Sequence, residues 1–172
     1  MSLSRRARAT LLALAAALAG ALPLAAPGTA LAGGVQPTPP YFTLRNLATG
    51  KCLEVADRRT DDGAPVRQWT CHGGPNQQWG IGYAGHGLVS RLSGTCLDVP
   101  GGSTVWGTQP VQWQCHLGTN QEWTVPGHGR PELDYLSALG LVLDVPGGST
   151  ADGTPVVLWG ANGGANQLWR AS

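Results

Sequence analysis

The sequence predicts an all-β domain built from three copies of one unit. Glycine is very frequent (26 residues), and the chain has seven tryptophans but only one phenylalanine. After Gly33, short alternating apolar segments are interrupted by glycine and proline, and none has a helical period. The octapeptide LDVPGGST also occurs twice, at Leu97–Thr104 and Leu143–Thr150. An identity of this length within 172 residues indicates internal duplication.

The first 32 residues have the pattern of a secretory signal peptide. Three basic residues stand near the start: Arg5, Arg6 and Arg8. Residues 10–26 are rich in leucine and alanine. Ala30 and Ala32 provide small residues at the two positions that signal peptidase recognises, so we predict cleavage after Ala32. A retained membrane anchor is the alternative. It is disfavoured because the apolar run is short and contains prolines. We therefore expect a secreted protein.

The rest of the chain has the length of one domain. Residues 33–40 are a short extended lead-in, and residues 41–172 form the predicted domain. Three of the eleven basic residues lie in the signal peptide, so the mature chain has eight basic and ten acidic residues and a net charge of −2. No basic patch stands out. We therefore expect that the protein binds neither nucleic acid nor, after signal cleavage, a membrane. We also expect a monomer.

The repeated unit is longer than the octapeptide. Three Q-x-W triplets, each preceded by asparagine, end at Trp79, Trp123 and Trp169, with spacings of 44 and 46 residues. Another tryptophan stands ten residues before each of these: Trp69, Trp113 and Trp159. The repeats cover about 41–84, 85–129 and 130–172. Three units are too few for a propeller, so we predict a closed threefold barrel.

Strand periodicity predicts which side chains face the core. Residues two apart in a strand share a face, so the leucine and valine of each L-[DE]-V segment point inward and the acidic residue is displayed at the surface. We expect Trp79, Trp123 and Trp169 to be buried core anchors. On residue chemistry alone, Asp98 and Asp144 are equally well explained as solvated turn caps before P-G-G-S-T and as ligand-binding groups.

Four cysteines stand in the first two repeats. The two in each repeat are 19 residues apart, and the third repeat lacks both. Three connectivities are possible. Because both cysteines are absent together from one repeat, we predict pairing within a repeat, which suits a secreted protein. The predicted disulfides are Cys52–Cys71 and Cys96–Cys115. His72 and His116 follow the second cysteines, but cysteines in disulfides cannot hold zinc, so we expect no metal.

Three Q-x-W triplets in register, each with C-L-[DE]-V or its equivalent upstream, make residues 41–172 resemble the ricin B-chain type lectins. This family is also grouped among the carbohydrate-binding modules and is common in secreted actinobacterial enzymes. The resemblance implies a β-trefoil of three pseudo-equivalent lobes. It also implies a protein that binds carbohydrate, of galactose or xylan type, and needs no cofactor.

The resemblance implies which residues bind the sugar. In the family, the acidic residue accepts bonds from sugar hydroxyls, the aromatic before the second cysteine stacks on the sugar, and the Asn-Gln pair adds polar contacts. The matching residues of the second repeat are Asp98, Trp113, Asn120 and Gln121. Those of the third repeat are Asp144, Trp159, Asn166 and Gln167. Those of the first are Glu54, Trp69, Asn76 and Gln77.

Two departures from the family pattern affect these sites. Glu54 is one methylene longer than aspartate, so its carboxylate is displaced and we expect the first site to bind sugar less well than the other two. Many members also carry glutamine two residues before the stacking aromatic. Those positions are Arg67, Val111 and Val157 here, so one hydrogen bond is missing or replaced in each repeat.

The sequence offers no catalytic arrangement. A glycosidase needs two carboxylates about 5–10 Å apart, whereas the acidic residues above belong to separate repeats. Glu132 and Asp134 are close in sequence but have no other site features around them. We therefore expect a lectin with up to three shallow sites that binds polysaccharide or clustered glycans by avidity. The alternative is a protein-interaction trefoil such as a protease inhibitor, which has no need of Asp, Trp and Asn together in two repeats.

Overall fold

A computed structural model describes residues 38–82, 87–125 and 135–172, which belong to one compact unit of residues 31–172. The predicted signal peptide and signal cleavage site lie outside the described residues, as do Glu132 and Asp134. Within the described ranges, no helix is long and apolar enough to span a membrane.

The chain consists of short strands joined by turns, as predicted, and several of the turns are single turns of 3-10 helix. The first repeat contains β2 (Leu44–Asn46), β3 (Cys52–Val55), β4 (Val66–Trp69) and β5 (Trp79–Ile81), preceded by β1 (Thr38–Phe42). The second contains β6 (Leu88–Ser90), β7 (Cys96–Asp98) and β8 (Val111–Trp113). The third contains β9 (Ser137–Ala138), β10 (Leu141–Asp144), β11 (Val157–Trp159) and β12 (Trp169–Ala171).

A 3-10 turn follows the acidic residue of each repeat, and another carries each Asn-Gln pair. The first kind comprises η1 (Ala56–Arg58), η4 (Pro100–Gly102) and η6 (Pro146–Gly148). The second kind comprises η2 (Pro75–Gln77), η5 (Thr119–Gln121) and η7 (Ala165–Gln167). Gly101 and Gly147 have φ of 61°, a conformation that glycine adopts without strain. In the first repeat, Asp57 takes this conformation instead (φ 54°).

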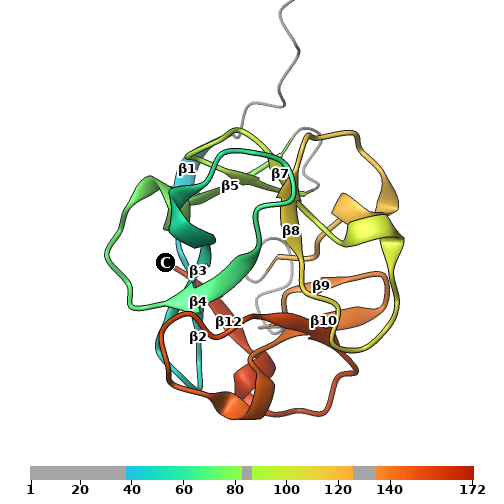
Figure 1. The fold of residues 1–172 in the computed structure, drawn as a ribbon. Helices are drawn as coiled ribbons and strands as arrows, with labels where there is room; N and C mark the ends of the chain where they lie inside the picture. Colours follow the sequence, from blue (N-terminus) through green and yellow to red (C-terminus); the bar gives the residue numbers. More distant parts are fainter. Residues whose placement is uncertain (1–37, 83–86, 126–134) are drawn as a thin grey trace, which may run out of the picture. The chain divides into compact units, whose positions relative to one another are not determined.

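Strand pairing repeats three times around the domain. The hairpins β3·β4, β7·β8 and β10·β11 share one register, in which the position of the first cysteine pairs with the stacking tryptophan. Adjacent repeats pair through β5·β6, through β12·β2 and through the isolated bridge Thr124↔Ser137. Figure 1 shows β2 beside β12, which joins the last repeat to the first. This is the predicted β-trefoil, with β1 added by pairing to β5.

The three tryptophans of the Q-x-W triplets form the centre of the core, as predicted. Trp79 and Trp169 are fully buried and Trp123 is 5% exposed. Each indole Nε1–H donates to a backbone carbonyl, namely Leu53, Leu97 and Leu143, at 2.9–3.1 Å. Each tryptophan therefore buries a large apolar ring and leaves no polar atom unsatisfied.

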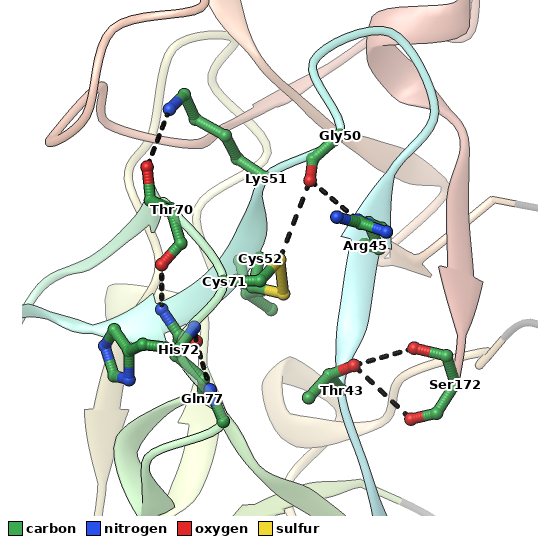
Figure 2. The surroundings of a disulfide bond; sticks show 12 residues. Thr43, Arg45, Gly50, Lys51, Cys52, Thr70, Cys71, His72, Gln77 and Ser172 are labelled. Carbon is green, nitrogen blue, oxygen red and sulfur yellow. Dashed lines mark hydrogen bonds between the residues drawn. A yellow bond between two sulfur atoms is a disulfide. The ribbon is translucent and has the colours of Figure 1, made fainter.

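Both predicted disulfides are confirmed. Cys52 pairs with Cys71 and Cys96 with Cys115, each with Cα atoms 5.1 Å apart. Figure 2 shows the first of these beside β2, where Arg45 Nε donates to Gly50 O at 2.7 Å. Each disulfide ties the first strand of a hairpin to the segment that follows the second strand.

Each repeat also holds the loop of the repeat before it. The backbone amides of Gly63, Gly107 and Gly153 donate to the central carbonyls of β8, β11 and β4 respectively. A side chain beside two of these glycines adds a second bond: Asp62 accepts from Gln114 N at 2.8 Å, and Asp152 accepts from Thr70 N at 2.7 Å. Asp152 also accepts from Lys51 Nζ at 2.6 Å, across the boundary between the third and first repeats.

We predict that the Asp152 contact makes stability depend on pH. The hydrogen bond from Lys51, with help from Thr70, lowers the pKa of Asp152 from its usual 3.8, although desolvation opposes this. A lowered pKa stabilises the folded state above about pH 3.8, and this stabilisation is lost as the pH falls through the lowered value. Asp152→Asn should therefore lower the Tm at about pH 7 and have less effect at about pH 2. Thermal melts of both proteins test this. A Tm difference that does not change with pH would contradict it.

Candidate functional site

The second and third repeats each bring an aspartate, an asparagine and a glutamine together. Asp98 Oδ2 accepts from Asn120 Nδ2 at 2.9 Å and from Gln121 Nε2 at 2.8 Å. In the third repeat, the corresponding bonds to Asp144 Oδ2 from Asn166 and Gln167 have the same lengths. The residues grouped by sequence are therefore neighbours in space.

The carboxylates are not displayed at the surface, and that prediction is wrong. Asp98 is 4% exposed and Asp144 is 5% exposed. Both point away from the tryptophan core, as strand periodicity requires, but η5 and η7 fold over them and bring the Asn-Gln pair onto the carboxylate. Each aspartate therefore lies in the floor of a pocket. Its second oxygen, Oδ1, accepts no hydrogen bond from any described residue.

The glutamine has no polar group to offer a ligand. Gln121 is 3% exposed, and its Nε2 donates to Asp98 and also to Gln114 O at 3.1 Å. Its Oε1 accepts from His116 N at 2.9 Å. Gln167 and Gln77 make the equivalent bonds, and Figure 2 shows Gln77 close to Thr70 and His72. The glutamine therefore holds the carboxylate and the chain after the second cysteine in place.

The asparagine differs, because its oxygen is free. Both hydrogens of Asn120 Nδ2 are used, by Asp98 Oδ2 and by Val99 O at 3.2 Å. Oδ1 accepts no bond within the described part of the chain, and Asn120 is only half-buried. Asn166 has the same arrangement with Asp144 and Val145. The aspartate and the asparagine of each of these two repeats therefore each have one oxygen that accepts no hydrogen bond from a described residue.

Two pockets contain these groups. The second-repeat pocket (about 670 Å³) is lined by Asp98, Asn120 and Trp113, and the third-repeat pocket (about 520 Å³) is lined by their equivalents. Val111 and Val157, which pair with the aspartates across the hairpin, supply apolar surface. Trp113 is 45% exposed and Trp159 is 38% exposed. Each pocket therefore combines an exposed tryptophan with an aspartate and an asparagine.

In the first repeat the carboxylate is fully used by the chain itself. Arg67 pairs with Glu54 across the hairpin, and its Nε donates to Glu54 Oε1 at 3.0 Å. Glu54 Oε2 accepts from Asn76 at 3.2 Å and from Gln77 at 3.0 Å. Both oxygens of this carboxylate therefore have protein partners.

The same arginine covers the ring of the first repeat. The Arg67 guanidinium lies 4.4 Å from the centroid of Trp69, in a cation–π contact, and also donates to Asp57 at 2.9 Å. Asn76 is 2% exposed, and its Oδ1 is buried without a hydrogen-bond partner. The predicted residues of this repeat come together, but Arg67 occupies the space between the carboxylate and the ring.

His72 and His116 each accept a hydrogen bond from a nearby backbone amide, and His116 also lines the second-repeat pocket. His116 Nδ1 accepts from Gly118 N at 3.1 Å, so the neutral ring carries its proton on Nε2, which lies 3.3 Å from Asp98 Oδ2. In the third repeat, Asn162 Oδ1 accepts from Gly164 N instead, at 2.8 Å. In residues 38–82, 87–125 and 135–172, no group of three His, Cys, Asp or Glu side chains could hold a metal ion.

Comparison with known families decides the relationship. The family model described as the ricin-type beta-trefoil lectin domain matches residues 40–169. The chain belongs to this lectin family.

Solved structures with the ricin-type lectin fold align over most of the domain. A designed threefold symmetric protein, ThreeFoil, is 38% identical (TM-score 0.67) over 76% of this chain and 96% of its own. The exo-β-1,3-galactanase 1,3Gal43A of Clostridium thermocellum is 33% identical (TM-score 0.68) over 79% of this chain, which spans only 30% of that enzyme. The C-half of an earthworm R-type lectin, in complex with GalNAc, is 20% identical (TM-score 0.62, 77% and 98% covered) and shows the fold alone.

We predict that the buried glutamine is essential for stability. Gln121→Ala removes bonds to a buried carboxylate and to two backbone groups, so we expect a loss of about 2–4 kcal/mol in the free energy of unfolding. The adjacent Glu122 is exposed, and Glu122→Ala should change it by less than about 0.5 kcal/mol. Chemical denaturation of both variants tests this. Equal effects would contradict it.

Proposed function

We propose that this protein is a secreted, non-catalytic lectin whose second and third repeats each bind a neutral sugar. The observation that carries the proposal is the free Oδ1 of Asp98 and of Asp144, each at a pocket floor beside an exposed tryptophan. The leader-like N-terminus and the two disulfides support secretion. The two carboxylates lie in separate repeats, which favours binding over glycoside hydrolysis.

The chemistry of the pocket selects the ligand. The free polar atoms of the aspartate and the asparagine are acceptors, so the ligand must supply hydrogen-bond donors. The negative charge of the carboxylate disfavours phosphates and acidic sugars. A neutral pyranose meets these demands, because its hydroxyls donate to the oxygens while its C–H face packs on Trp113 or Trp159. In this proposal Gln121 and Gln167 position the aspartates and do not touch the sugar.

The first repeat is not a working site in this proposal. Arg67 already provides what a sugar would provide, namely donors to Glu54 and a partner for the face of Trp69. A ligand would have to displace a paired guanidinium from a nearly buried carboxylate, which is costly. We therefore expect two sugars to be bound by each molecule.

Two shallow sites favour polymeric ligands. Each site alone should bind weakly, and two sites in different repeats gain avidity on a polysaccharide or on clustered glycans. Galactose-type and xylan-type glycans are the proposed classes. The galactanase that is 33% identical to this chain supports the galactose class.

We predict that binding depends on the charge of both aspartates. Asp98→Asn with Asp144→Asn keeps an oxygen that can accept from the Asn-Gln pair but replaces the free oxygen with an NH₂ group. Loss of one charge-assisted bond should weaken each site about 10- to 100-fold. Binding of the protein without its signal peptide to immobilised galactans and xylans measures this, with Glu122→Gln as a control for lost surface charge. If the unmodified protein binds no glycan, or the double variant binds normally, the proposal is wrong.

A second prediction concerns the closed repeat. Glu54→Asp with Arg67→Val gives the first repeat, at these two positions, the residues of the other two repeats. It also removes the guanidinium from the face of Trp69. The number of sugars bound per molecule should rise from two to three. Isothermal titration with a monovalent sugar that binds the unmodified protein measures this number. A value that stays at two would show that Arg67 is not what closes the site.

A further inference from the structure

One repeat boundary differs from the other two. Asp62 and Asp152 each accept a hydrogen bond from an amide of the next repeat. The matching residue of the second repeat is Trp106, which reaches the third repeat and packs against Trp159. The ring centroids are 5.0 Å apart and the planes are inclined by 40°.

A glycine makes room for this ring. A Cβ atom at Gly160 would lie 2.7 Å from Trp106 Cζ2, a distance that real Cβ atoms do not adopt. The equivalents of Gly160 in the other repeats are Thr70 and Gln114, which have side chains. The close approach of Trp106 to the third repeat therefore depends on a second change, in the repeat that receives it.

Trp106 crosses the repeat boundary but remains largely exposed. It is 58% exposed, and the neighbouring Val105 is 69% exposed. Trp159 keeps an exposure of 38%, close to the 45% of Trp113, which has no such neighbour. Trp106 therefore adds apolar surface beside Trp159 without covering it. We call Val105, Trp106 and Trp159 the platform.

We infer that the third-repeat site extends across the repeat boundary onto Trp106 and binds two consecutive units of a neutral glycan chain. This inference rests on the proposed function. Trp159, Asp144 and Asn166 bind one unit, and the next unit stacks on Trp106. The second-repeat site, where Asp62 stands in place of Trp106, binds a single unit.

The chemistry of the platform fits a sugar chain. Consecutive units of a polysaccharide each present an apolar C–H face, and two adjacent rings inclined to each other can each take one. One additional stacking contact should strengthen binding about two- to tenfold. The site would then prefer oligosaccharides to monosaccharides, which the second site would not.

The experiment must also distinguish sugar binding by Trp106 from a purely structural role at the repeat boundary. Leu158 replaces the buried glutamines, Gln68 and Gln112, that bond to the preceding loop in the other repeats. Trp106 could compensate for those lost bonds. Trp106→Asp separates the two roles, because it restores the residue found at 62 and 152, whose carboxylate can accept from Gly160 N. This substitution removes the platform and keeps a boundary contact.

The experiment compares Asp98→Asn, which silences the second site, with Asp98→Asn/Trp106→Asp. The probes are galactose, β-1,3-galactotriose, xylose and xylotetraose, measured by isothermal titration. ¹H–¹⁵N spectra follow the Trp106 indole N–H signal, which is assigned by its loss in the double variant. We expect an oligosaccharide to bind Asp98→Asn two- to tenfold more tightly than its monosaccharide, and to shift the Trp106 signal. This preference should disappear in the double variant, with monosaccharide affinity unchanged.

The other outcomes identify which idea fails. Equal affinity for mono- and oligosaccharide in both variants overturns the inference and leaves the proposed function intact. Tighter binding after Trp106→Asp means that Trp106 shields the site, and also overturns it. A lower unfolding midpoint with unchanged sugar preference assigns Trp106 to the boundary alone. Failure of the unmodified protein to bind any probe defeats the proposed function in these glycan classes and the inference with it.

Discussion

The structure depends on one buried side chain that occurs three times, the glutamine of each Q-x-W triplet. It bonds to the carboxylate, to the carbonyl before the second cysteine position and to the amide after it. Two residues later, the tryptophan of the triplet fills the core. The glutamine therefore connects packing at the centre to polar groups at the periphery. Burial of the tryptophan therefore helps to position the carboxylate. In the second and third repeats the glutamine binds only Oδ2, and no described residue donates to Oδ1.

Repeat periodicity predicted the fold and the grouping of the site. The core tryptophans, both disulfides and the neighbouring Asp, Asn and Gln follow from residues that recur in register. Periodicity could not predict the burial of Asp98, because that depends on a turn more than twenty residues later folding over the strand. The contacts of Arg67 with Glu54 and of Trp106 with Trp159 were not predicted, because they involve residues that differ from their equivalents in the other repeats.

Both features do have a signal in the sequence. Arg67 stands where the other repeats have valine, directly opposite the carboxylate in the hairpin. Trp106 stands where they have aspartate, and Gly160 where they have residues with side chains. Arg67 and Trp106 change the charge or size of the side chain at positions where the other two repeats agree with each other, and Gly160 loses a side chain that both other repeats have. In a repeat protein such exceptions indicate where a copy has acquired a property of its own, and structure is needed to say which.

The three sites can differ because the hydrogen bonds that hold each carboxylate come from its own repeat. The bonds that hold Asp144 come from the third repeat alone, and those that hold Asp98 come from the second. Arg67 satisfies the first repeat internally, so it remains a stable part of the barrel without a ligand. Two backbone bonds between a strand and the loop of the preceding repeat recur at all three boundaries. The side chains beside those bonds are therefore free to differ, and a tryptophan at one boundary can alter the adjacent site without altering the fold.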